Sequence, residues 1–122
     1  MRKLVVALSL FAFCGTLATV VLAADEKPKH TIKQVMKVAM KDGLCKKVAG
    51  GKASQADKNK LLDAFLSLLD NKPPKGDAAS WNAKAGGLVI AAAKIAVGRK
   101  GGEAALKKAA NCGACHKAHK GK

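Results

Sequence analysis

Aromatic side chains are scarce in this chain: among 122 residues there are three Phe, one Trp and no Tyr. Proteins that bind single-stranded nucleic acids stack bases on aromatic rings, so this composition offers them few platforms. It also leaves little aromatic volume for a hydrophobic core. Close packing of helices through small residues, or a bound apolar group, must therefore fill the interior.

Acidic residues are also few, since 8 Asp and Glu stand against 23 Lys and Arg, and the formal net charge is +15. Apolar residues still make up 49 % of the chain, which is enough to bury a core and excludes a disordered polycation. Most lysines are expected to be solvated, and lysines around a functional site would attract acidic proteins. No nucleic-acid recognition motif accompanies the charge, so we expect no nucleic-acid partner.

The first residues have the pattern of an export signal. Two basic residues precede an apolar run over 4–22, and small residues follow from Ala23. This pattern is typical of a secretory signal peptide, although about 20 apolar residues could also form a transmembrane anchor. The small residues that follow the apolar run favour a cleaved signal peptide over a membrane anchor. We therefore predict a signal peptide over 1–23, one domain over 24–122, a periplasmic location and no stable membrane insertion once the signal is removed.

The rest of the chain has the periodicity of helices. No segment alternates between apolar and polar residues as a strand does, whereas four segments repeat apolar residues at spacings of three and four. The predicted helices cover about 32–48, 55–69, 81–96 and 103–119. Short loops between four helices imply an all-α fold, an antiparallel up-down-up-down bundle.

Glycines lie inside two of the predicted helices. Gly43 falls within the apolar stripe of the first helix and is expected to weaken or bend it. Gly86 and Gly87 fall within the third helix, where they predict either a kink or a close approach by another backbone or a ligand.

The motif that carries chemistry is C-x-x-C-H, formed by Cys112, Cys115 and His116. It is the attachment signature of a covalent c-type haem. On a helix these residues fall at i, i+3 and i+4 and share one face. The two sulfurs can add to the two vinyl groups on one haem edge while the imidazole points at the iron. We therefore predict haem c, held by thioethers at Cys112 and Cys115, with His116 as the proximal iron ligand.

Three other sites use similar residues, and each has a weakness here. A thioredoxin-like dithiol requires a βαβ context, which the pattern lacks. A zinc site that added His119 to the motif would take all its ligands from one helix face, which cannot surround a tetrahedral ion. A disulfide between Cys112 and Cys115 within one helix has poor geometry. We expect His119 to be a solvated residue at a frayed helix end.

The motif lies near the C-terminus of the last predicted helix, and in this the chain resembles the cytochrome c′ family, also called class II cytochromes c. The matching residues are Cys112, Cys115, His116 and a Met on the first helix. The resemblance implies an antiparallel four-helix bundle with a covalently attached haem. One subgroup of the family leaves the sixth iron position open, and a low-spin subgroup fills it with a Met from the first helix. The chain looks most like the low-spin subgroup.

Two methionines of the first helix could provide the distal ligand. In an up-down-up-down bundle the first and fourth helices run antiparallel, so His116 lies near the start of the first helix. Met36 is close to that start, and Met40 lies one turn deeper, about 6 Å along the axis. We predict Met36 as the distal iron ligand. Met40 and a vacant sixth position remain the alternatives, because a buried Met is often core filler.

These predictions favour a periplasmic electron carrier whose partners are acidic redox proteins. The alternative is a five-coordinate haem protein of the cytochrome c′ type that binds nitric oxide or carbon monoxide. We expect no enzymatic activity, since no distal His, Arg or carboxylate arrangement is evident near the predicted iron. Cys45 is the odd thiol beside the motif and is either an inert, partly buried side chain or the site of a disulfide-linked homodimer.

Overall fold

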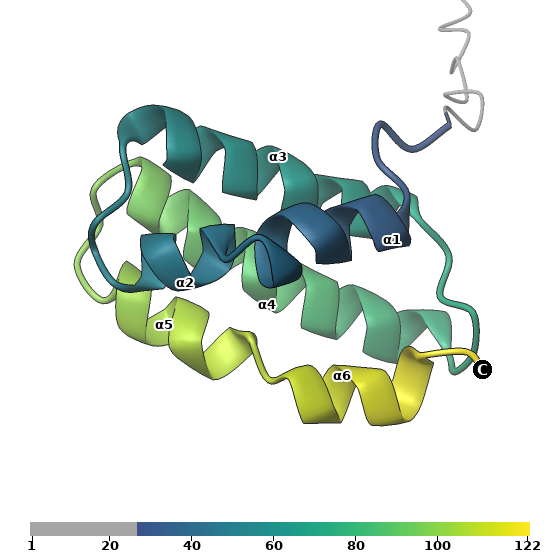
Figure 1. Ribbon diagram of the computed structural model, residues 1–122. Coiled ribbons are helices and arrows are strands. Elements are labelled where there is room, and N and C mark those ends of the chain that lie inside the picture. Colours follow the sequence, from purple (N-terminus) through teal and green to yellow (C-terminus); the bar gives the residue numbers. More distant parts are fainter. Residues whose placement is uncertain (1–26) are drawn as a thin grey trace, which may run out of the picture.

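A computed structural model describes residues 27–122, so the predicted signal peptide over 1–23 lies outside the described residues. The described part is all-α and contains no strand. Its elements are α1 (Ile32–Val35), the π-helix η1 (Met36–Lys41), α2 (Leu44–Ala49), α3 (Gln55–Asp70), α4 (Ala78–Ala96), α5 (Gly102–Ala109) and α6 (Cys112–His119) (Figure 1). Over residues 27–122, none of these helices is both long enough and apolar enough to cross a membrane.

The segment predicted as the first helix is broken rather than bent. It begins as expected with a capping box, in which Thr31 Oγ1 accepts a hydrogen bond from the Gln34 N–H at 3.2 Å and Gln34 Oε1 accepts one from the Thr31 N–H at 2.8 Å. α1 then continues directly into η1, whose π-helical turns are wider than those of an α-helix. At Gly43 the backbone has a φ of +78°, a conformation that glycine adopts without strain, and α2 begins after it.

The segment predicted as the last helix is also broken, between Ala110 and Cys112. The Asn111 side chain accepts a hydrogen bond from the Ala114 N–H at 3.1 Å and so acts as the N-cap of a new helix. The prediction of one continuous helix over 103–119 was therefore wrong. Cys112 is the first residue of α6 rather than a residue in the middle of a longer helix.

The two long helices agree with the sequence prediction. Ser54 and Asp77 form the N-caps of α3 and α4, respectively. α4 is helical through both Gly86 and Gly87. A Cβ at Gly87 would lie 3.9 Å from the Cβ of Ala109, which is an ordinary packing distance, so the glycine pair marks a place where α5 approaches α4.

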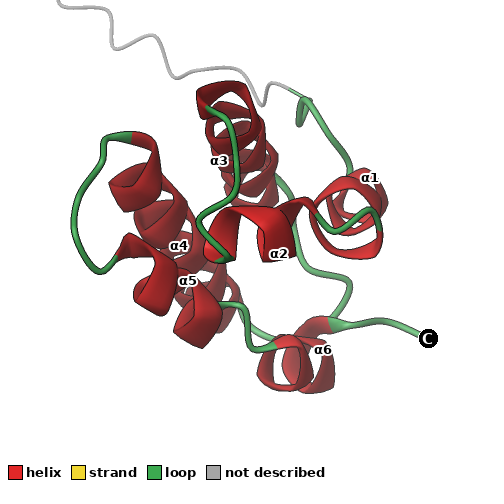
Figure 2. Ribbon diagram, turned by 60° about the vertical axis from the view of Figure 1, so that its left-hand side comes forward, coloured by secondary structure: helices red, strands yellow, loops and turns green. Residues whose placement is uncertain are grey.

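The helices enclose a core that is poor in rings. α3 packs along α4, α4 packs along α5, and the broken segment from α1 to α2 covers α3, with α6 beside the start of α4 (Figures 1 and 2). Phe65 and Trp81 are both buried. The Trp81 indole N–H donates to the carbonyls of Leu68 at 2.9 Å and Asn71 at 3.0 Å, and it thereby joins the start of α4 to the end of α3. The rest of the core is aliphatic and rich in Ala.

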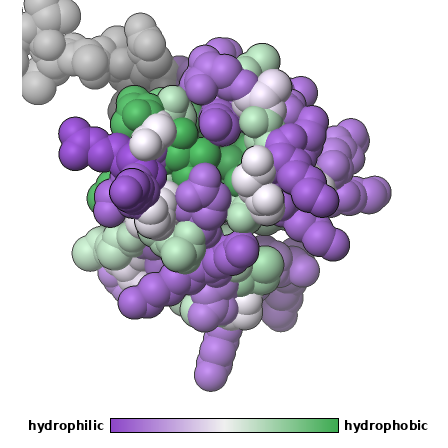
Figure 3. Space-filling view, turned by 90° about the vertical axis from the view of Figure 1, so that its left-hand side faces the viewer, coloured by the Kyte–Doolittle hydropathy of each residue, from purple (hydrophilic) through white to green (hydrophobic). Residues whose placement is uncertain are grey.

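The surface is predominantly hydrophilic. On the face that carries the α2–α3 and α4–α5 loops, hydrophilic side chains surround a smaller hydrophobic area (Figure 3). Four large apolar side chains of the described residues are exposed: Leu66 and Leu69 on α3, Ile90 on α4, and Val97 directly after α4. Exposed apolar side chains are thus few.

Candidate cofactor-binding site

The C-x-x-C-H motif forms the first turns of α6. The helix places Cys112, Cys115 and His116 at i, i+3 and i+4, as the sequence predicts. Cys112 is exposed, with its Sγ 3.7 Å from the Ala110 carbonyl oxygen. Cys115 is half-buried and packs against the core, and His116 is exposed. Both cysteines of the motif are free thiols, so the side chains that the attachment chemistry requires are available.

A groove of about 820 Å³ lies between the first, broken segment and the last one. Its volume falls within the range of about 300–1,000 Å³ that cofactor pockets typically have. Cys112 borders it, together with residues of η1, α2 and α5. The lining consists of Ala39, Met40, Gly43, Cys45, Lys46, Lys47, Ala49, Gly50, Lys52, Leu106, Lys107, Ala110 and Cys112.

The lining has two chemical parts. One part is apolar and small, formed by alanines, Met40 and Leu106. The other consists of four lysines, all of them exposed: Lys46, Lys47, Lys52 and Lys107. An apolar floor with cationic side chains suits a ligand that has a flat apolar body and carboxylate groups.

The two candidate methionines both belong to η1, but they differ in position. Met40 lines the groove together with Cys112. Met36 is half-buried and packs against the core, and it is not among the residues that line the groove. His116 is not among them either. The structure therefore brings together Cys112 and Met40, whereas the predicted ligation by Met36 stays a prediction.

Cys45 is a buried thiol that borders the same groove. Burial raises the pKa of the Cys45 thiol above its ordinary value of 9.0, and the nearby Cys112 raises it further. Burial also raises the pKa of Cys115, and Lys84 partly opposes that rise. Both thiols are therefore protonated at neutral pH. The burial of Cys45 favours an inert side chain over a link to a second chain.

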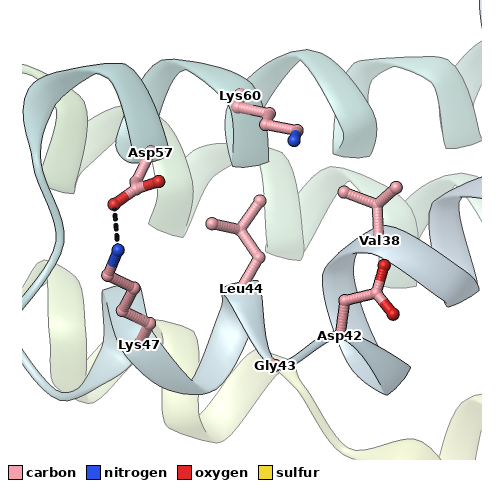
Figure 4. A pocket seen from close by; sticks show the side chains of 7 residues that line it. All are labelled: Val38, Asp42, Gly43, Leu44, Lys47, Asp57 and Lys60. Atoms are coloured by element: carbon pink, nitrogen blue, oxygen red, sulfur yellow. Dashed lines mark ion pairs between the residues drawn. The ribbon is translucent and has the colours of Figure 1, made fainter.

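A second, smaller pocket of about 230 Å³ opens at the Gly43 break (Figure 4). Lys47 and Asp57 form an ion pair across it, with 2.6 Å between Nζ and Oδ2. The hydrogen bond from Lys47, together with one from the Ser54 backbone, lowers the pKa of Asp57 from its ordinary value of 3.8. None of the predicted haem ligands borders this pocket. The ion pair across it connects α2 to α3.

The sequence prediction for His119 was wrong. Its side chain is only 2 % exposed. Nδ1 lies 3.1 Å from the Lys75 carbonyl oxygen and Nε2 lies 3.0 Å from Ser80 Oγ. The ring also makes an edge contact with Trp81, with 5.5 Å between the ring centroids. The partners come from the loop before α4 and from its first turn, far away in the sequence, so helix periodicity gave no signal of this burial.

Two features of the structure bear on function: the thiol–imidazole motif at the start of α6 and the groove that Cys112 borders. The described residues hold no cluster of three or more His, Cys, Asp or Glu side chains suited to a metal ion. A haem iron needs no such cluster, because the porphyrin supplies four of its ligands. When it is compared with known proteins, the chain matches no protein-family model, no curated protein and no solved structure.

Proposed function

We propose that this protein is an exported c-type cytochrome that transfers single electrons through a covalently bound haem. We further propose that its fold is an antiparallel four-helix bundle of the cytochrome c′ type. In it, the segment from α1 to α2 is the first helix and the segment from α5 to α6 is the fourth, each with one break. The observation that carries the proposal is the position of Cys112, the first thiol of the motif, at the edge of a cofactor-sized groove.

The groove and the motif that begins at its edge together supply the groups that haem c needs. Cys112 and Cys115 supply two thiols one helical turn apart, and His116 supplies an imidazole on the same face. Leu106 and the neighbouring alanines offer an apolar floor for the porphyrin ring. Bound haem supplies an iron that cycles between the ferric and ferrous states, with a potential set by its axial ligands and its burial.

Each group of side chains has a distinct role in this function. Cys112 and Cys115 would hold the cofactor at two points. His116 would supply an imidazole nitrogen to the iron. Lys46, Lys52 and Lys107 would offer positive charge to the haem carboxylates. The same lysines attract an acidic redox partner to this edge of the molecule.

The lining of the groove supports Met40 as the sixth iron ligand, while the sequence argument supports Met36. The two residues are four positions apart on η1, about one helical turn, so they offer the iron two different positions. A thioether ligand stabilises ferrous iron relative to ferric iron, and a His/Met pair therefore gives a higher potential than two imidazoles. Either methionine suits an electron carrier.

The decisive experiment is performed on the mature holoprotein. Haem should remain with the polypeptide after acid–acetone extraction, and the mass should be that of the mature chain plus one haem. A colourless polypeptide with the mass of the bare chain would show that the proposal is wrong. The oxidised protein should be low-spin and show the weak near-infrared band of sulfur-to-iron charge transfer.

Met36→Ala and Met40→Ala form a matched pair. The substitution that removes the ligand should abolish the near-infrared band, lower the reduction potential and allow carbon monoxide to bind, whereas the other should leave the band in place. If the unmodified protein is already high-spin and binds carbon monoxide readily, the gas-binding function replaces electron transfer.

A further inference from the structure

His119 occupies a hydrogen-bonding network that determines the tautomer of its ring. A carbonyl oxygen can only accept, so His119 Nδ1 donates to the Lys75 carbonyl at 3.1 Å. Lys84 Nζ donates to Ser80 Oγ at 3.0 Å, and this leaves the Ser80 hydroxyl hydrogen free for His119 Nε2, also at 3.0 Å. Both ring nitrogens are therefore satisfied in the neutral ring.

The loop before α4 closes tightly over this ring. Gly76 has a φ of +82°, and a Cβ at that position would lie 2.7 Å from both the Ala118 carbonyl oxygen and His119 Nδ1. Only glycine fits there. On its other side the ring meets Trp81 edge-on, with 78° between the two planes. Because Trp81 also bonds to the end of α3, the network connects α6 with both long helices.

The orientation of α6 depends on few other contacts. The helix is separated from α5 by the break at Asn111, and it packs chiefly on α4. Most of its residues are exposed, and His119 is its only buried one. A short helix that begins after a break is held by what anchors its far end, and here that anchor is His119.

We propose that His119 is a positioning residue for haem attachment: its two hydrogen bonds and its contact with Trp81 fix α6 so that Cys115 and His116 are presented together to the cofactor. The proposal rests on the proposed function. His119 lies four residues after Cys115 and three after His116, one turn along the same short helix. A rotation of α6 released at this end would therefore move both groups.

Lys84 is a further part of the same arrangement. Ser80 holds its ammonium group next to the His119 ring. From there Lys84 lies near enough to Cys115 to oppose the effect of burial on the pKa of that thiol.

The test compares holoproteins produced with the haem-attachment machinery. His119→Phe keeps a ring against Trp81 and removes both hydrogen bonds, and His119→Asn retains a donor near the Nδ1 position. We expect His119→Phe to increase the fraction of chains with one thioether instead of two, measured by peptide mass, on the order of tenfold, because two buried hydrogen bonds are lost. His119→Asn should restore part of the double attachment. His30→Phe, at a histidine that bonds only to Asp63 and Asn71, is the control and should leave attachment unchanged.

A second readout separates positioning from general stability. In an acid titration of the holoprotein, the spectral change that reports loss of His116 from the iron should occur about one pH unit higher in His119→Phe, while far-UV circular dichroism still shows native helix content. If His119→Phe does not accumulate, Ser80→Ala replaces it, with an expected effect of about threefold. Normal double attachment and an unchanged titration in these variants would overturn the positioning role while the cytochrome assignment stands. Absence of haem from the unmodified protein would overturn the proposed function itself.

Discussion

Asp57 connects two elements through a single carboxylate. Its Oδ2 accepts a hydrogen bond from the Ser54 N–H at 3.2 Å and pairs with Lys47 at 2.6 Å, so α3 is capped and joined to α2 by the same atom. These contacts lower the pKa of Asp57 below 3.8 in the folded protein. A group with a lowered folded-state pKa stabilises the fold above its ordinary pKa, and the contribution is lost as the pH falls through the folded value.

Asp57→Asn should therefore lower the free energy of unfolding at pH 7 and have a smaller effect near pH 2, below the ordinary pKa of the carboxyl, where its contribution is being lost. The measurement is denaturant unfolding of variant and parent protein at the two pH values. The comparison near pH 2 is the control for the change in side-chain size and shape. An equal loss of stability at both values would mean that the charge of Asp57 contributes nothing.

At the same scale, the sequence predicts the chemistry of the site but not its surroundings. The spacing of Cys112, Cys115 and His116 is a local property, and a single helical turn is enough to place them on one face. The burial of His119 depends on a carbonyl 44 residues earlier in the chain. The position of Met40 at the groove depends on where η1 lies relative to α5. Both require the tertiary structure.

At the scale of the helices, glycine stabilises the fold at one position and weakens it at another. Gly43 has a positive φ and no heavy atom within 4 Å of an added Cβ. Gly43→Ala should therefore destabilise the protein by about 1 kcal/mol through backbone strain alone. Gly86 also has open space around an added Cβ, but it lies within α4. Gly86→Ala should stabilise the protein by about 0.5–1 kcal/mol.

Thermal unfolding of the two variants and the parent protein checks this pair. Because neither substitution creates a clash, the difference between them isolates the backbone conformation. The same direction of change in both variants would contradict the assignment of Gly43 to a left-handed turn.

The long helices were predictable and the breaks were only partly so. α3 and α4 combine a long apolar stripe with clear caps, Ser54 and Asp77. Gly43 gave a signal for the first break. Asn111 gave little signal for the second break, because Asn also occurs within helices and the apolar spacing continues across it. The π-helical turns of η1 have no distinct sequence pattern, so the periodicity of this segment could not reveal them.

For the whole molecule, we expect stability to depend on the cofactor. Among residues 27–122, Phe65 and Trp81 are the two buried Phe, Tyr or Trp side chains, and the groove is bordered by half-buried apolar side chains such as Met40 and Ala110. Small domains are marginally stable, and each kcal/mol contributed by a buried cofactor raises Tm by about 4–8 °C. The chain without haem should therefore unfold at a clearly lower temperature and over a broader range than the holoprotein.

Circular dichroism melts of the two forms measure this difference. The apo form is obtained by expressing Cys112→Ala/Cys115→Ala, which cannot form thioethers. Matching, sharp transitions in both forms would show that the polypeptide core is sufficient and that the groove contributes little to folding.

The joint at Asn111 also changes how the chain can accept insertions. In a continuous helix, one added residue rotates everything after it by about 100° and would turn the motif away from the groove. Here α5 ends at Ala109 and a separately capped helix starts at Cys112. A residue added between them lengthens a loop, while Asn111 still sets the start of α6 and His119 still fixes its end. The helix that lines the groove and the helix that carries the C-x-x-C-H motif thus have separate ends, and we expect the connection between them to tolerate a change in length.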